Sequence, residues 1–123
     1  MSKFLTPLIV EKVEGSDDDW KLVDLFQYQS DIGGLITVEI GMITDFASVP
    51  QFAWILFPKS GKYDGAALIH DHCYQKQIYP RAKADSIFLE AMQVLEVPWW
   101  KRHIIYRSVR IFGGLYWEKH SIV

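Results

Sequence analysis

Hydrophobic positions in the first third of the chain follow a period of two, which is typical of β-strands with one buried face. The clearest run is residues 36–42, where large apolar side chains alternate with smaller or polar ones. Residues 4–13 and 20–28 are also rich in β-branched and aromatic residues. Polar and glycine-rich stretches at residues 15–19 and 33–34 separate these segments, as turns do. The pattern predicts about three antiparallel strands before residue 44.

The second half changes to the spacing of amphipathic helices, with apolar residues three and four positions apart. Helices are predicted over residues 62–77, 80–95 and 98–112. Pro80 and Pro98 stand at the predicted starts, where proline is tolerated because the first N–H groups of a helix have no partner within it.

A shorter helix is predicted ahead of these three. Ser48-Val49-Pro50-Gln51 has the S-x-x-Q form of a capping box, and Pro58 and Gly61 are expected to end the helix that follows. The Gly113-Gly114 pair is expected to close the last helix. Strands followed by helices predict an α+β fold, in which a small antiparallel N-terminal sheet packs against about three C-terminal helices.

Composition narrows the class of protein further. The chain has 123 residues, half of them hydrophobic, which suits a single domain spanning residues 1–123 with a real core. A net charge of −2 makes nucleic acid an unlikely partner. Cys73 has no second cysteine to pair with, and we expect it to be a small buried residue. No apolar run is long enough for a transmembrane segment, and the start lacks a signal-peptide core. We therefore expect synthesis and folding in the cytoplasm.

The predicted helix 62–77 carries the first chemical lead. Tyr63, Ala67, His70 and Tyr74 fall on one stripe, with Asp71 on its flank, so His70 is expected to face inward. An imidazole beside a carboxylate can bind a metal or act as a base with its charge partner. The alternative is a hydrogen-bonded histidine of the core.

Two carboxylates can join this pair. Asp85 lies within the apolar arc of helix 80–95, together with Arg81 one turn earlier, so the two can form a structural salt bridge or Asp85 can reach His70. Asp45 lies where the last strand gives way to the helices, and it can serve as a ligand, a base or a turn residue. Ser48 is expected to cap the short helix and not to act as a nucleophile, because no elbow motif surrounds it.

The last predicted helix is strongly basic. His103, Arg107 and Arg110 are spaced as one stripe, which can be a solvated face, a clamp for an anionic ligand or countercharge for the aspartates. Trp99 and Trp100 at its start are expected to pack, although the Trp99–Arg102 segment can also rest on a membrane surface.

These residues, in this order, resemble a phage and prophage family catalogued as domain of unknown function 1353. The resemblance covers roughly residues 35–115 and rests on the segment 44–50, on His70-Asp71 with Tyr74, and on Arg81 and Ala84-Asp85. Arg107, Arg110 and Gly113 also stand where that family tends to have arginine and glycine. The resemblance implies a phage origin but no activity.

A second, local resemblance concerns one helix only. His70-Asp71-His72-Cys73-Tyr74 is similar to the H-D-x-C-Y stretch of secreted phospholipases A2, in which the histidine activates water and the next aspartate holds calcium. The chain departs from that family because it lacks the glycine-rich calcium loop and the many cysteines.

Three functions remain open from the sequence. The first is a small hydrolase, assisted by a divalent cation and acting on host envelope material. The second is a non-catalytic virion protein of the tail or baseplate, bound to other phage structural proteins, whose polar cluster is structural. The third is an anti-host binding factor. For the hydrolase, the expected catalytic residues are Asp45, His70, Asp71 and Asp85; the expected metal ligands are Asp45, His70 and Asp71; and the expected ligand-binding residues are Arg81, Tyr74, Arg107 and Arg110.

Overall fold

The computed structural model describes residues 1–56 and 64–121, and within them the chain is α+β, with strands first and helices after. Two antiparallel sheets of three strands each occupy the N-terminal half. One has the order β1-β4-β5 and the other the order β2-β3-β6. The strands are β1 (Lys3–Phe4), β2 (Val10–Lys12), β3 (Trp20–Leu22), β4 (Phe26–Ser30), β5 (Gly34–Val38) and β6 (Ile43–Thr44).

Each of the three expected strands is divided in two, which is why the single predicted sheet is two small ones. Pro7 lies between β1 and β2, and a proline cannot donate a hydrogen bond to a strand ladder. Between β3 and β4 the Asp24 carboxylate accepts a hydrogen bond from the N–H of Leu25. Between β5 and β6 Gly41 has φ of +96°, a conformation that favours glycine. The chain therefore turns at three places within the region that was predicted to form three unbroken strands.

The helices follow the predicted spacing closely. They are the 3-10 helix η1 (Gln51–Leu56), α1 (Asp64–Lys76), α2 (Arg81–Val94), α3 (Trp99–Phe112) and α4 (Gly114–Ser121). Pro80 and Pro98 immediately precede α2 and α3. The expected helix end at Pro58 and Gly61, and the first two residues of the expected helix 62–77, lie outside the described residues.

The helix α4 was not predicted, because the Gly113-Gly114 pair was expected to end the helical region. Gly113 instead has right-handed helical angles, with φ of −72° and ψ of −14°, so the chain bends there and continues as α4. An ideal Cβ on Gly113 would lie 2.8 Å from the Tyr74 hydroxyl oxygen, so the glycine allows close contact with α1 rather than a left-handed helix end.

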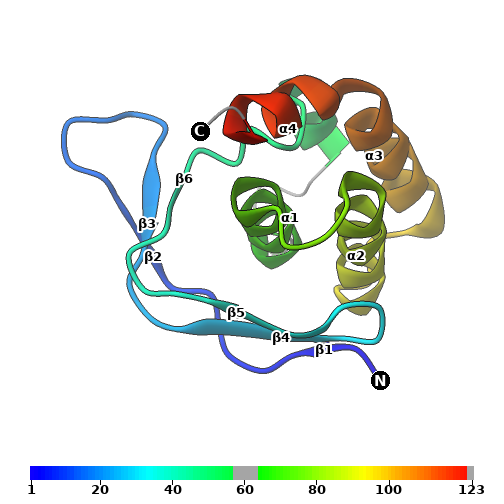
Figure 1. Ribbon diagram of the computed structural model, residues 1–123, viewed down its shortest axis with the longest axis horizontal. Helices are drawn as coiled ribbons and strands as arrows, with labels where there is room; N and C mark the ends of the chain where they lie inside the picture. Colours follow the sequence, from blue (N-terminus) through cyan, green and yellow to red (C-terminus); the bar gives the residue numbers. More distant parts are fainter. Residues whose placement is uncertain (57–63, 122–123) are drawn as a thin grey trace.

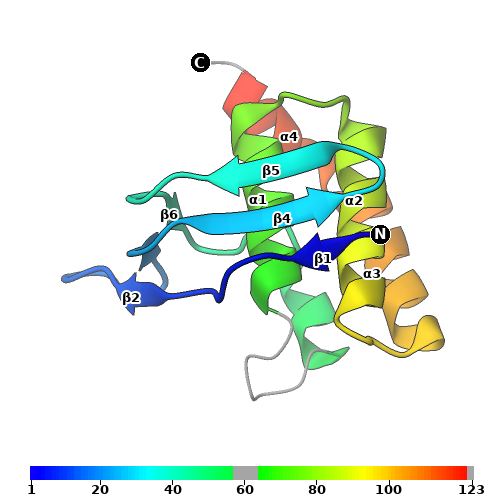
Figure 2. The same cartoon turned by 90° about the horizontal axis from the view of Figure 1, so that it is seen from below.

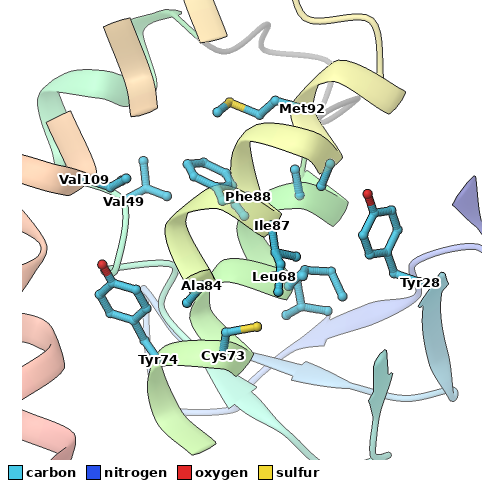
Figure 3. Packing of buried hydrophobic residues seen from close by; sticks show 14 of the residues in the cluster. Tyr28, Val49, Leu68, Cys73, Tyr74, Ala84, Ile87, Phe88, Met92 and Val109 are labelled. Atoms are coloured by element: carbon cyan, nitrogen blue, oxygen red, sulfur yellow. The ribbon is translucent and has the colours of Figure 1, made fainter. Parts of the chain in front are cut away.

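The elements form three layers (Figures 1 and 2). The sheet β1-β4-β5 covers one side of the α1–α2 pair, and α3 and α4 cover the other side. Alternation in β4 directs Phe26 and Tyr28 into the core, while the intervening glutamines are only half-buried. Leu68 of α1 and Ile87 and Phe88 of α2 belong to one buried hydrophobic cluster (Figure 3). The side of α1 that faces α2, α3 and α4 carries the polar residues described next.

No described helix has the length and apolar character needed to cross a membrane.

Candidate functional site

His70 lies at the centre of a buried polar chain that joins a loop, α1 and α2. Its Nε2 is 2.7 Å from Oδ1 of Asp85 on α2, and its Nδ1 is 2.9 Å from Oγ of Ser48 in the loop after β6. The rings of Tyr74 and Phe88 lie against the imidazole, with centroids 4.3 Å and 4.5 Å away. His70 therefore has a hydrogen-bond partner at each ring nitrogen. A catalytic base with a charge partner needs this arrangement, and a hydrogen-bonded histidine of the core has it too.

Asp85 receives three donors and is held as a carboxylate. Besides His70, the Tyr74 hydroxyl donates to Oδ1 at 2.6 Å and Arg110 donates to Oδ2 at 2.6 Å. Burial raises the pKa of Asp85, but the hydrogen bonds from these three groups and the attraction of His70 outweigh burial and hold the pKa below its usual value. A carboxylate accepts and does not donate, so Nε2 of His70 carries a proton. In the neutral imidazole, Nδ1 is then the acceptor and the Ser48 hydroxyl is the donor.

Of the two alternatives for Asp85, the structure shows the contact with His70 and not the salt bridge with Arg81. The Arg81 guanidinium donates instead to the carbonyl oxygens of Val109 and Arg110, at 2.9 Å and 2.7 Å. Both carbonyls lie in the last turn of α3, where a cation is favourable, and the carbonyl of Val109 also accepts the backbone N–H of Gly113 at 2.8 Å. The cation paired with Asp85 is Arg110, from α3, which confirms the countercharge alternative for the basic helix.

Asp71 ties the loop after β6 to α1. It accepts hydrogen bonds from the Thr44 hydroxyl, from the backbone N–H of Ser48 at 3.3 Å and from the side chain of Gln75 at 3.0 Å. All of these partners are donors, so the carboxylate positions Ser48 and does not point its oxygens at a free site. The calcium-binding role that the phospholipase resemblance implies for this aspartate has no support in these contacts.

Asp45 is the candidate residue that the structure separates from the others. Its side chain is exposed and accepts a hydrogen bond from the N–H of Ala47 at 2.9 Å, which is the turn chemistry of an Asx motif. The predicted metal set of Asp45, His70 and Asp71 is not assembled, because His70 and Asp71 direct their polar atoms at protein partners. Residues 1–56 and 64–121 contain no group of three or more histidine, cysteine, aspartate or glutamate side chains that could hold a metal ion.

The other titratable groups of α1 lie outside this chain of contacts. Burial, with a smaller effect of Lys76, lowers the pKa of His72 to about 4. Burial, with a smaller effect of Asp85, raises the pKa of Cys73 to about 12, so this thiol is an inert core group, as expected. Arg107, which was expected to bind a ligand, is exposed on α3.

Ser48 is the residue whose part in the site was not predicted. It was expected to cap the short helix, yet its hydroxyl contacts His70 and its side chain is 1% exposed. The signal in the sequence was its place in the Thr44–Pro50 segment. The family resemblance covers both that segment and the helix that carries His70. A serine two residues before a proline at a helix start, however, fits a helix cap equally well.

A pocket of about 650 Å³ is lined in part by the same loop. Asp45, Phe46, Ala47 and Val49, the residues on either side of Ser48, are among its lining residues. Phe46 has φ of +58°, which a bulky residue rarely adopts. The remaining lining residues are Val10, Asp17, Asp18, Trp20 and Asp64.

Comparison with known proteins finds one family. A family model described as a protein of unknown function, DUF1353, matches residues 20–109, which is most of the chain and includes every residue of the polar chain from Ser48 to Asp85. No curated protein and no solved structure shows a significant match.

Proposed function

The chain belongs to the DUF1353 family, and we propose that it is a small hydrolase in which Ser48 is the nucleophile, His70 the general base and Asp85 the charge partner of the base. The observation that carries the proposal is the unbroken line from Ser48 Oγ to His70 Nδ1 at 2.9 Å and from His70 Nε2 to Asp85 at 2.7 Å. A hydroxyl, an imidazole and a carboxylate joined in this order are the components of nucleophilic acyl transfer.

The chemistry follows from the direction of the hydrogen bonds. His70 Nδ1 accepts the proton of the Ser48 hydroxyl as Oγ attacks the carbonyl carbon of an ester or amide, and the imidazolium then gives this proton to the leaving group. A water molecule, deprotonated in turn by His70, releases the acyl group from Oγ. Asp85 stabilises the imidazolium that forms between these steps, because it remains ionised next to Nε2.

Three features outside this line support the assignment. Tyr74 and Arg110 hold Asp85 through two other hydrogen bonds, which keep the carboxylate in place beside His70. Asp71 holds the backbone of Ser48. The pocket lined by the neighbours of Ser48 gives a substrate a place beside this loop, and movement of the loop between Thr44 and Pro50 would expose Oγ to it.

This proposal replaces the metal-assisted mechanism with a metal-free one. It keeps His70 and Asp85 in catalytic roles, gives Asp71 a positioning role and gives Asp45 none. We extend it to ester- or amide-containing envelope material of a bacterial host as substrate, in keeping with the phage origin that the family resemblance implies.

A second candidate is the non-catalytic virion protein, in which the same contacts only fix the packing of the helices. The observation that favours it is burial, because the side chains of Ser48, His70, Asp71 and Asp85 are all buried. Polar networks that are fully hydrogen-bonded within a core can specify one arrangement of its elements.

Hydrolysis of p-nitrophenyl butyrate by the purified chain, with wild type compared with Ser48→Ala and His70→Gln, separates the two candidates. The hydrolase predicts turnover by wild type and a loss on the order of 10³-fold or more in each variant. Ser108→Ala is the matched control, because Ser108 is also buried but donates to the carbonyl of Ile105. A wild-type rate equal to that of Ser48→Ala, with both variants folded, would overturn the hydrolase and leave the structural candidate.

A further inference from the structure

Several large apolar side chains on α3 and its neighbours are exposed. Trp99 and Trp100, which were expected to pack, are 66% and 53% exposed, and Ile111 is 70% exposed. Together with their neighbours they make up an apolar face, which consists of Phe52 and Ile55 of η1, Trp99, Trp100, Ile104, Ile111 and Phe112 of α3, and Leu115 of α4.

Helical spacing and one aromatic contact relate these side chains to one another. Trp100, Ile104 and Ile111 recur at the spacing of one helical stripe, on the side of α3 opposite the buried Ile105 and Val109. Phe112 lies on the flank of this stripe, and its ring meets Phe52 of η1 edge-on at 5.4 Å between centroids. Figures 1 and 2 place α3 at the edge of the molecule, on the side of the α1–α2 pair away from the β1-β4-β5 sheet.

The same helix carries only positive charge. Lys101, Arg102, Arg107 and Arg110 lie on α3, which has no aspartate or glutamate, although the whole chain has a net charge of −2. Arg107 is exposed and lies within the apolar stripe, between Ile104 and Ile111. The Lys101 ammonium lies 5.6 Å from the ring centroid of Trp100, so the aromatic and cationic groups are interleaved.

We propose that this apolar face docks on an anionic lipid surface. Tryptophan and isoleucine side chains enter the headgroup region, and Lys101 and Arg107 pair with lipid phosphates. A second copy of the chain fits less well, because a two-fold contact through α3 would bring the same cations against one another. The bulky apolar groups between the cations likewise do not suit a nucleic acid, whose backbone demands charge and hydrogen bonds.

This inference goes beyond the proposed hydrolysis and does not depend on it. Docking requires only the exposed residues of η1, α3 and α4. Vesicle binding can therefore be measured in the Ser48→Ala variant, for which no hydrolysis is expected. A chain that docks but does not hydrolyse would refute the proposed function alone, and a chain that hydrolyses but does not dock would refute this inference alone.

Vesicle flotation of the full chain tests the proposal. The probes are vesicles of phosphatidylcholine alone and of phosphatidylcholine with phosphatidylglycerol, at low and high salt. We expect binding to the anionic vesicles that weakens in high salt and is weak on the neutral vesicles. Trp99→Ser/Trp100→Ser and Lys101→Gln/Arg107→Gln should each reduce the bound fraction at least tenfold, which is the loss of an interaction of about 1.4 kcal/mol or more.

The matched control is Leu35→Ser/Ile78→Ser, which removes two exposed apolar side chains that belong to other parts of the chain. We expect this control to bind anionic vesicles as well as wild type does. Circular dichroism should show that all of the variants are folded. The proposal is overturned if wild type does not float with anionic vesicles or if the tryptophan variant floats as well as the control. It is also overturned if sedimentation shows a dimer that this variant abolishes.

Discussion

Replacing Asp85 by asparagine is the change that most directly probes the buried polar chain. The substitution keeps the size of the side chain but removes its charge, and its amide nitrogen donates where the carboxylate accepted. Of the three donors on Asp85, from His70, Tyr74 and Arg110, at least one therefore loses its acceptor. We expect a large loss of stability without a change of fold.

The magnitude follows from the burial of the two charged partners. Removing one partner of a buried ion pair costs about 3–5 kcal/mol. The Arg110 side chain is 34% exposed, so its guanidinium regains some water and we expect the lower end, about 3 kcal/mol. For a domain of this size that loss lowers Tm by roughly 10–15 °C. Because the folded pKa of Asp85 is depressed, its contribution is present above about pH 4 and is lost as pH falls further.

Urea unfolding and thermal melts followed by circular dichroism measure this loss. Asp45→Asn is the matched control, because Asp45 is exposed and holds only its own turn, and it should cost less than about 1 kcal/mol. The double variant Asp85→Asn/Arg110→Gln should be more stable than the sum of the single variants predicts, by about 1–3 kcal/mol. An Asp85→Asn protein as stable as Asp45→Asn at neutral pH would show that the contacts of Asp85 do not hold the helices together.

Three further predictions concern two histidines of α1 and the junction between α3 and α4. Burial lowers the folded pKa of His72 to about 4, well below that of an unfolded histidine, so the free energy of unfolding of the wild type should fall by about 3 kcal/mol between pH 6.5 and pH 4. His72→Gln should remove this pH dependence in urea titrations. An unchanged pH profile in the variant would contradict the buried neutral state of His72. Nitrogen NMR should show His70 protonated at Nε2 and unprotonated at Nδ1, and the opposite tautomer would reverse the direction of the bond to Ser48. Gly113→Ala should lower Tm because its Cβ would come within 2.5 Å of the Val109 carbonyl oxygen and 2.8 Å of the Tyr74 hydroxyl. Gly114→Ala, with no atom closer than 3.8 Å, should be neutral or stabilising, and equal melts for the two would refute the tight contact.

Much of the fold could be predicted from spacing alone. The boundaries of α2 and α3 follow from apolar periodicity and from Pro80 and Pro98, which act locally and leave a clear mark in the sequence. The splitting of the strands could not be predicted, because alternation says which face a side chain occupies and not where the backbone turns. The continuation into α4 was missed for a related reason, since glycine permits both a helix end and a close helix contact.

The site was predicted in part. His70, Tyr74 and Asp85 were expected to face inward from helical spacing, and they do meet. Two cations were possible partners of Asp85, namely Arg81 on the same helix and the basic stripe of the last helix, and the partner is Arg110 of that stripe. A contact between distant elements leaves no spacing signal. The same is true of the contact between Ser48 and His70, and the local sequence around Ser48 indicated only a helix cap.

Reaction of the folded chain with a phosphonofluoridate, followed by intact mass and peptide mapping, tests the proposed nucleophile most directly. This reagent forms a stable bond to a serine oxygen that an adjacent base has activated. The hydrolase predicts one added group per chain, located on Ser48, absent from His70→Gln and retained in Ser108→Ala. The absence of label from Ser48 in the wild type, or equal labelling of Ser48 in wild type and His70→Gln, would contradict it.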